Sequence, residues 1–374
     1  MKNLNSDTVL EALQNVTYKD KPLPEAGVVQ KIEAKDDIFG KEVKLDLQID
    51  SPAIHVKKKL EEDITRAVKE KFGDDVQVKT TIRVVVPEDE KMKPIERIKN
   101  IIAVASGKGG VGKSTVTANL AAALAKMGFK VGILDADVYG PSIPLMFGTQ
   151  DERPRAVKEN GKLYIIPIES EGVKMLSIGY FADPGQAVIW RGSMANSALN
   201  QMMFDTKWGD LDFLLIDLPP GTGDIQLSVM QMVPVTGAVV VTTPQNVAVA
   251  DVRKAINMFE NPSIKVPVLG IIENMSYFSP AECPENKYYI FGRDGGKNLA
   301  RNLNLPFLGE VPLVQSIRES GDAGRPAALQ ENTEIAKIWE EITKNVVEKT
   351  VERNKKLPPT EKIRITNQAG CAVK

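Results

Sequence analysis

Nine consecutive residues have the types and spacing of a phosphate-binding loop. The pattern G-x-x-x-x-G-K-[ST] lets glycine backbone N–H groups wrap around a phosphate at the start of a helix. Its lysine, Lys113, would meet the β- and γ-phosphates of a nucleotide, and the hydroxyl of Ser114 suits Mg²⁺. The loop consists of Gly107, Lys108, Gly109, Gly110, Val111, Gly112, Lys113, Ser114 and Thr115.

Two acidic residues follow the loop at positions that suit phosphoryl transfer. Asp137 lies just after the apolar stretch Val131–Asp135, and we expect it to orient the attacking water. Asp217 ends another apolar stretch in the position of a Walker B acid, where it would hold Mg²⁺ through water. The N–H of Gly221 would then sense the γ-phosphate. Either acid alone is equally typical of a loop cap, but together with the phosphate loop they predict an ATPase or a nucleotide switch that binds ATP and Mg²⁺.

Apolar runs alternate with helix-like segments from residue 96 onward, which is typical of a parallel sheet. The phosphate loop would follow the first strand and open the helix Thr117–Met127, which Gly128 would end. We predict an α/β fold, with a mostly parallel P-loop NTPase sheet and helices on both faces over residues 96–350. Ligands would bind beyond the carboxyl ends of its strands. The candidate strands are Ile101–Ala105, Val131–Asp135, Phe213–Asp217, Ala238–Thr242, Val268–Ile272 and Phe307–Gly309.

A small α+β domain is predicted ahead of that sheet, over residues 1–86. Residues 87–95 are polar and bounded by proline, as in a linker, and residues 351–374 are expected to form a flexible tail. The expected elements of the small domain are a helix opened by Ser6 or Asp7, strands at Gly27–Ile32, Val43–Ile49 and Val76–Val86, and an amphipathic helix containing Leu60, Ile64, Val68 and Phe72 that ends at Gly73.

The composition excludes several other classes of protein. Lys and Arg number 48 and Asp and Glu 49, so the formal net charge of −1 gives no basis for binding nucleic acid by bulk charge. No stretch approaches the ~20 apolar residues that span a bilayer. The N-terminus lacks the apolar core of a secretory signal. We therefore expect a cytoplasmic protein without membrane or nucleic-acid partners.

Soft metal ligands are scarce in this chain. They are limited to Cys283, Cys371 and His55, and His55 is more typical of a surface or partly packed residue than of a ligand. This scarcity excludes a disulfide framework and a self-contained His/Cys metal site within one subunit.

Lys108 gives the phosphate loop the form K-G-G-x-G-K-[ST], which resembles the deviant Walker A loop of the MinD/ParA/Mrp ATPases. In that group the early lysine reaches across a nucleotide-sandwiched dimer to the partner's phosphates. The resemblance therefore implies a homodimer in which Lys108 acts in trans, much as an arginine finger does. A surface lysine in a permissive loop is the alternative.

Longer motifs resemble the Mrp/ApbC family of P-loop ATPases, implicated in carrying iron–sulfur clusters, over roughly residues 96–345. The resemblance implies cluster transfer to apo-proteins, with cluster-assembly proteins as further partners. It also implies that Asn274 and the segment near Pro312 lie near the adenine. Residues 1–86 resemble, more weakly, an iron–sulfur-assembly-type domain often fused ahead of such ATPases. The motifs are Asp135–Ser142, Trp190–Met194, Asp217–Asp224 and Glu273–Phe278.

The chain departs from this family at its cysteines. Many members carry Cys-x-x-Cys just after the segment Glu273–Phe278, which across a dimer gives four thiolates for a bridging [4Fe–4S] cluster. Here Cys283 stands alone. Three interpretations remain open. In the first, the tail folds back so that Cys283 and Cys371 of two subunits supply four thiolates. In the second, Cys283 shares a cluster with thiols of a partner protein. In the third, both cysteines are ordinary and no cluster is bound.

The leading hypothesis is an ATP-hydrolysing iron–sulfur cluster carrier or scaffold, gated by nucleotide as a dimer, with Cys283 as a candidate cluster ligand. The alternative is a MinD/ParA-like regulatory ATPase switch without a cluster. The Trp190–Gly192 segment and the fused N-terminal domain favour the carrier. The apolar stripe from Ile335 to Val347 is typical of core packing rather than of a membrane anchor. A metabolic kinase is not favoured, because no acceptor-substrate motif is present.

Overall fold

The computed structural model describes residues 4–18, 21–37, 40–49, 54–84, 94–159, 161–181, 192–261, 264–280, 282–283 and 285–359. The chain divides into two compact units, with the division between residues 92 and 93. Each unit has its own cluster of buried apolar side chains, so each is described by itself.

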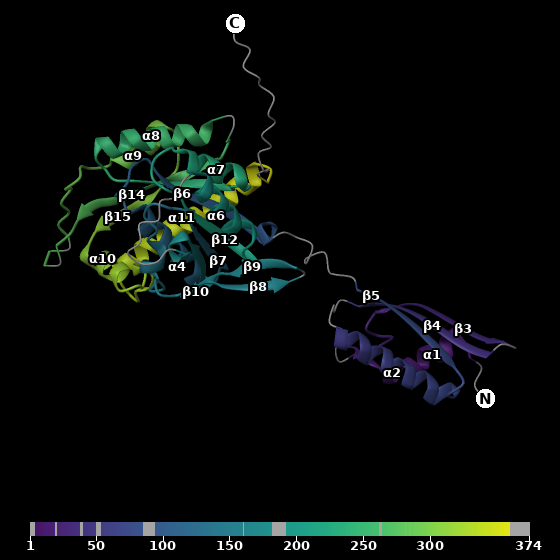
Figure 1. Ribbon diagram of the computed structural model, residues 1–374. Helices are drawn as coiled ribbons and strands as arrows, with labels where there is room; N and C mark the ends of the chain where they lie inside the picture. Colours follow the sequence, from purple (N-terminus) through teal and green to yellow (C-terminus); the bar gives the residue numbers. More distant parts are fainter. Residues whose placement is uncertain are drawn as a thin grey trace, which may run out of the picture. The chain divides into compact units, whose positions relative to one another are not determined.

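The first unit is a three-stranded sheet with α1 and α2 packed against it (Figure 1). Strand β4 lies in the middle, antiparallel to β3 and parallel to β5. Its elements are α1 (Ser6–Ala12), a 3₁₀ turn η1 (Leu13–Asn15), β1 (Thr17–Tyr18), β2 (Lys21–Pro22), β3 (Val29–Asp37), β4 (Gly40–Ile49), α2 (Ile54–Phe72) and β5 (Gln77–Val84).

The predicted start of the first helix is wrong by one or two residues. Asn5, rather than Ser6 or Asp7, is the N-cap, because its side-chain oxygen accepts a hydrogen bond from the Thr8 N–H at 2.9 Å. The Thr8 hydroxyl in turn accepts from the Asn5 N–H at 3.1 Å, which completes a capping box. The backbone N–H groups of Asn5 and Thr8 therefore each have a side-chain acceptor.

The amphipathic helix of this unit is confirmed. It is α2, its apolar stripe is buried, and Gly73 follows it with φ +101°, a conformation that suits glycine. Strand β3 begins at Val29 rather than at Gly27, since Gly27 has φ +67° and lies in the preceding turn. The buried stripe consists of Leu60, Ile64 and Val68.

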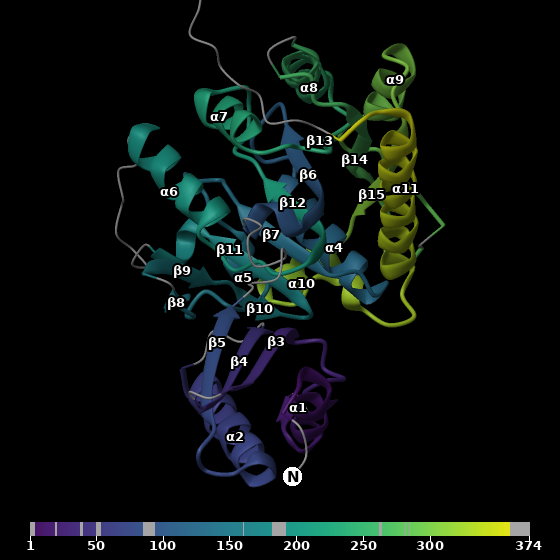
Figure 2. The ribbon, with the colours of Figure 1, turned by 90° about the vertical axis from the view of Figure 1, so that its right-hand side faces the viewer.

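The second unit is an eight-stranded sheet in the order β10-β11-β7-β12-β6-β13-β14-β15 (Figure 2). All neighbours are parallel except β10 and β11. Helices α4 and α11 contact each other on one face, and α8 and α9 cover the other. Strands β8 and β9 form a separate antiparallel pair. The strands of the unit are β6 (Ile98–Ser106), β7 (Val131–Asp135), β8 (Arg155–Glu159), β9 (Lys162–Ile166), β10 (Ile168–Ser170), β11 (Val173–Ser177), β12 (Leu211–Asp217), β13 (Gly237–Thr242), β14 (Val268–Phe278) and β15 (Phe307–Leu313).

Helices in this unit connect the parallel strands, as the α/β prediction requires. The full set is η2 (Pro94–Arg97), α4 (Lys113–Lys126), α5 (Ile143–Met146), η3 (Ile178–Phe181), α6 (Gly192–Phe204), α7 (Asp224–Met232), α8 (Asn246–Glu260), α9 (Gly295–Asn302), α10 (Gln315–Asp322), η4 (Ala327–Leu329) and α11 (Glu334–Lys356). No helix in the described part of the chain is both long and apolar enough to cross a membrane.

All six predicted strands are present, and each of them except β7 is longer than predicted. Strand β14 continues to Phe278 and β15 to Leu313, so Asn274 and Pro312 lie within strands. The predicted helix at Thr117 begins earlier, at Lys113, because Gly112 adopts the left-handed conformation that turns the chain into the helix.

Some elements of the second unit were missed or misplaced. Strands β8–β11 were not predicted, since each has only three to five residues. The 3₁₀ turn at Pro94 takes up the end of the expected linker. Helix α11 runs to Lys356, so the predicted tail cannot begin at residue 351. The core-packing role of this helix is confirmed by its buried Ile335, Trp339, Ile342 and Val346.

Replacing Leu45 with alanine should destabilise the first unit selectively. Leu45 is fully buried in the core of that unit, so Leu45→Ala should cost about 2–5 kcal/mol through lost burial and a cavity. Hydrogen exchange should therefore accelerate in β3–β5 and stay unchanged in β6 and β12. Leu10→Ala, at a position that is 40% exposed, is the matched control. Equal loss of protection in both units would contradict the assignment of two separate cores.

Candidate functional site

The phosphate loop connects strand β6 to helix α4 and depends on glycine at two close approaches. A Cβ on Gly107 would lie 2.2 Å from the backbone carbonyl carbon of Asp251 in α8. A Cβ on Gly112 would lie 2.2 Å from the side-chain nitrogen of Asn274, and Gly112 also has φ +81°. These contacts explain the glycines, and the turn leaves the first N–H groups of α4 directed at the loop.

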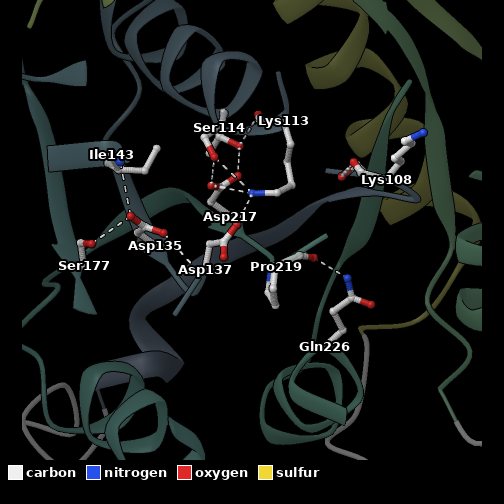
Figure 3. A network of polar contacts seen from close by, with 12 residues as sticks. Lys108, Lys113, Ser114, Asp135, Asp137, Ile143, Ser177, Asp217, Pro219 and Gln226 are labelled. Atoms are coloured by element: carbon white, nitrogen blue, oxygen red, sulfur yellow. Dashed lines mark hydrogen bonds and ion pairs between the residues drawn. The ribbon is translucent and has the colours of Figure 1, made fainter. Parts of the chain in front are cut away.

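A buried lysine at the start of α4 lies between two carboxylates (Figure 3). The ammonium of Lys113 is 2.8 Å from Oδ2 of Asp217 and 3.5 Å from Oδ2 of Asp137. Asp217, which is fully buried at the end of β12, also accepts hydrogen bonds from the hydroxyls of Ser114 at 2.5 Å and Thr117 at 2.6 Å. Buried charges are tolerated when they are paired and hydrogen-bonded in this way. The fold thus brings together residues that were predicted from separate parts of the sequence.

Two other predicted site residues are directed elsewhere. Lys108 is exposed, and its side chain points away from Lys113 (Figure 3). The N–H of Gly221 donates to the Ser106 carbonyl at 3.0 Å, which ties the loop after β12 to the end of β6. The same loop is held from the other side, because the side-chain nitrogen of Gln226 in α7 donates to the Pro219 carbonyl. Contact between the Gly221 N–H and a phosphate requires exchange of its present hydrogen bond.

Asp135, at the end of β7, is a site residue to which the sequence assigned no role. It is fully buried, and its Oδ2 accepts hydrogen bonds from the Ser177 hydroxyl at 2.8 Å and the Ile143 N–H at 3.3 Å. Its Oδ1 accepts from the Asp137 N–H at 3.2 Å. Burial, and then the negative charge of Asp217, raises the pKa of Asp135 to about 7. In the sequence it is visible as an acid at the carboxyl end of an apolar strand and as the first residue of the Asp135–Ser142 motif.

Asn274 contacts the phosphate loop and lines a cavity beside it. Its side-chain nitrogen donates to the Val111 carbonyl at 2.8 Å. The cavity has a volume of about 230 Å³ and lies between the start of α4 and the segment that joins β15 to α10. Its walls include Thr115 and Pro312, and apolar side chains of Leu313, Val314 and Ile317.

Cys283 lies in the loop that follows β14. Phe278 and Tyr288 exchange two backbone hydrogen bonds of 2.8 Å and so close this loop at its base. The thiol of Cys283 is free and half-buried. Within the described ranges, no group of three or more His, Cys, Asp or Glu side chains is arranged to hold a metal ion. Cys371, Trp190, Arg191 and the side chain of His55 lie outside the described residues.

The sheet order, the phosphate loop and the buried lysine define a P-loop NTPase. Residues 97–347 match the family described as NUBPL iron-transfer P-loop NTPase, so the chain belongs to that family. Residues 6–80 match a family described as iron–sulfur cluster assembly protein. The predicted fold class and the resemblance to iron–sulfur carrier ATPases are confirmed.

Individual relatives agree with this assignment. An iron–sulfur cluster carrier protein of Synechocystis is 41% identical over 353 residues, covering 92% of this chain and 98% of its own. The Escherichia coli protein of the same name is 49% identical over 253 residues, covering 67% of each chain. A nucleotide-binding protein from Archaeoglobus fulgidus, solved in complex with ADP, is 42% identical with a TM-score of 0.55 and covers 64% of this chain and 91% of its own.

In the protein without nucleotide or metal, Asp135 should make a contribution to stability that falls as the pH rises from about 4 to about 7, and Asp135→Asn should remove this contribution. The folded state keeps the Asp135 proton up to a pKa of about 7, whereas the unfolded chain releases it near 3.8. The folded state therefore binds more protons in this window, and the free energy of unfolding falls as the pH rises. Urea unfolding of both proteins across this range measures the difference.

Asp212→Asn is the matched control for this pH dependence. Hydrogen bonds from Lys99 and from the Lys130 backbone lower the pKa of Asp212. Its carboxylate therefore stabilises the folded state above the ordinary pKa, and this contribution is lost as the pH falls. Removing it should change the profile in the opposite sense. Parallel profiles for Asp135→Asn and the unchanged protein would contradict the raised pKa of Asp135.

Proposed function

We propose that this protein is an ATP-binding and ATP-hydrolysing carrier or scaffold for iron–sulfur clusters. It works as a homodimer, its nucleotide state gates the cluster, and it delivers clusters to apo-proteins after loading by cluster-assembly proteins. Support comes from the NTPase family match, from relatives named as cluster carriers, and from the matched assembly-type region at the N-terminus. The observation that carries the proposal is the course of strand β14, which contacts the phosphate loop and continues into the Cys283 loop.

The nucleotide site follows from the charges around Lys113. The loop from Gly107 to Thr115 would surround the phosphates, and Lys113 would exchange its carboxylate partners for them. The hydroxyl of Ser114 and the carboxylate of Asp217 are hard oxygen ligands that fit Mg²⁺, which would neutralise charge on the phosphates. Asp137, which lines the opposite side of the ammonium, is the candidate for orienting the attacking water.

The cavity beside Asn274 is the candidate adenine site. It adjoins Thr115 at the end of the phosphate loop and has apolar walls, as a flat heterocyclic base requires. Asn274 itself donates to the Val111 carbonyl, so its remaining amide oxygen and the Pro312 segment border the base. The size of about 230 Å³ suits the base alone, with the ribose and phosphates extending toward Lys113.

Strand β14 links this nucleotide site to the cysteine loop over a short distance in the chain. Asn274 holds the phosphate loop, and Phe278, four residues later, closes the loop that contains Cys283. Between them Met275 has φ +53°, an unusual conformation for a residue with a side chain. A shift of the phosphate loop on nucleotide binding would therefore act on the base of the Cys283 loop. This is the route by which we propose that ATP gates the cluster.

Cluster ligation in this protein requires thiols from more than one source. Two copies of Cys283 in a homodimer supply two thiolates, fewer than the four of an ordinary [4Fe–4S] site. Cys371 of each subunit, or cysteines of the donor and recipient proteins, would supply the others. The alternative function is that of a MinD/ParA-like regulatory ATPase without a cluster, which the lone Cys283 favours.

Lys113→Ala should abolish ATP turnover, because the phosphates lose their buried cation. Lys108→Ala should also lose turnover, while keeping ATP binding, if the exposed Lys108 acts on the partner's phosphates. The sharpest measurement is the ATPase rate of the two inactive variants mixed together. A mixed dimer contains one site with both lysines, so part of the turnover should return. Lys344→Ala, an exposed lysine on α11, is the control. Undiminished turnover by Lys108→Ala would contradict the trans role.

Anaerobic reconstitution with ferrous iron and sulfide should load the protein with a cluster that depends on Cys283. Iron and sulfide per subunit, measured with ATP binding in the same samples, should fall strongly in Cys283→Ser. Cys371→Ser is the matched variant: loss of the cluster there assigns its thiol as a ligand, and retention points to thiols of partner proteins. Failure of the unchanged protein to bind iron and sulfide, with ATP binding intact, would contradict the carrier and favour the switch.

A further inference from the structure

The segment that carries Asp137 leaves strand β7 and reaches helix α5 with few long-range hydrogen bonds. Among the described residues, the Val138 and Gly140 N–H groups donate only to carbonyls within the segment itself. The Ala136 N–H donates to the Asp217 carbonyl at 2.9 Å, and Asp137 forms an ion pair with Lys113. The segment also donates two hydrogen bonds to the Asp135 side chain, from the Asp137 and Ile143 N–H groups. Asp135 therefore holds both ends of the segment that carries Asp137.

Asp135 joins three parts of the second unit through its two oxygens. It accepts from the Asp137 N–H at the start of the segment and from the Ile143 N–H at its end, so it closes residues 137–143 into a loop (Figure 3). It also accepts from the Ser177 hydroxyl on the neighbouring strand β11, where Ser177 and Asp135 are partners in register. The Gly179 N–H donates to Ser177 at 3.0 Å and fixes the direction of that hydroxyl.

We propose that Asp135 is a positioning residue for ATP hydrolysis, whose carboxylate holds residues 137–143 so that Asp137 stays beside Lys113. The inference rests on the proposed ATPase function and names a residue for that reaction beyond the phosphate loop and the acids assigned from the sequence. Asp135 itself contacts neither the phosphate loop nor the ammonium of Lys113 by hydrogen bond or ion pair among the described residues. It acts through Asp137.

The arrangement of donors makes the carboxylate difficult to replace. Both oxygens of Asp135 accept, one from Asp137 and the other from Ile143 and Ser177. An asparagine of the same shape has one accepting oxygen and one donating nitrogen. Whichever way its amide is turned, the nitrogen faces a backbone N–H, and that N–H loses its acceptor in a buried site. One end of the 137–143 loop is therefore released.

The test compares Asp135→Asn and Ser177→Ala with a control variant, Thr149→Val. Thr149 also has a buried hydroxyl, bonded to the Tyr180 hydroxyl at 2.7 Å and donating to the Pro144 carbonyl at 3.2 Å, but it forms no hydrogen bond with residues 137–143 among the described residues. We expect kcat for ATP hydrolysis to fall about tenfold to a hundredfold in Asp135→Asn, because small displacements of a catalytic group have effects of this size. KM for ATP should stay within about threefold, since the phosphate loop is untouched. Ser177→Ala should move kcat in the same direction, and Thr149→Val should leave both constants unchanged.

Hydrogen exchange provides a readout that is independent of turnover. Amides of residues 137–146 should exchange faster in Asp135→Asn and Ser177→Ala, while those of residues 107–115 should keep their protection. An unchanged kcat in Asp135→Asn would overturn the inference, and so would a fall in kcat accompanied by an equal rise in KM or by loss of protection throughout the second unit. If Asp135→Asn does not fold, the same criteria apply to Ser177→Ala. Absence of ATP hydrolysis in the unchanged protein would instead overturn the proposed function.

Discussion

The ammonium of Lys113 lies in the interior of the second unit, 2.8 Å from Asp217, where a positive charge is stable only among partners. The partners come from the ends of β12, which lies beside β6 in the sheet, and of β7, which lies on the other side of β12. Parallel strands bring their carboxyl ends to one edge, so the phosphate loop, Asp217 and Asp137 meet there although they are far apart in the chain. Two carboxylates close to one ammonium, with Asp135 buried behind them, leave an excess of negative charge. Burial raises the pKa of Asp135, and the negative charge of Asp217 raises it further.

Strand β14 contacts the phosphate loop on one face and helix α9 on the other, because successive side chains of a strand point to opposite faces. Asn274 turns toward the phosphate loop, where it bonds to the Val111 carbonyl. Glu273, beside it, turns toward helix α9 and accepts a hydrogen bond from the Gly296 N–H. Burial raises the pKa of Glu273, whereas that hydrogen bond favours its charged form. One strand therefore fixes the phosphate loop on one face and α9 on the other before it enters the Cys283 loop.

The single cysteine of that loop sets this chain apart from the Cys-x-x-Cys pattern that the family resemblance implies. A pair of thiols in each loop would make a dimer sufficient for a four-thiolate cluster. With Cys283 alone, two copies of the loop provide two thiolates, so a cluster held there would need thiols from further segments or proteins. A cluster with shared or incomplete ligation is also easier to pass on, since fewer bonds to the carrier must break. A single cysteine in this loop is therefore compatible with a cluster carrier and unfavourable to a permanently bound cluster.

Local features of the sequence determined the phosphate loop, the six strands β6, β7, β12, β13, β14 and β15, and helix α2. Each depends on contiguous residues: glycines that permit a tight turn, apolar runs buried on both faces, or a repeat that follows the helical period. The starts of α1 and α4 were misplaced, because the first depends on the hydrogen bonds between Asn5 and Thr8 and the second on the left-handed backbone of Gly112.

Only the tertiary structure decided which distant residues act on the site. Ser177 is 42 residues from Asp135, and Asn274 is 163 residues from Val111, so their contacts depend on strand order and register. The hydrogen bond that the Gly221 N–H donates to Ser106 likewise exists only once β12 lies beside β6. The sequence by itself therefore determined that a nucleotide phosphate site is present and where its loop lies. The packing of strands decided how its acids are held, because a buried carboxylate takes its partners from whatever the fold places next to it.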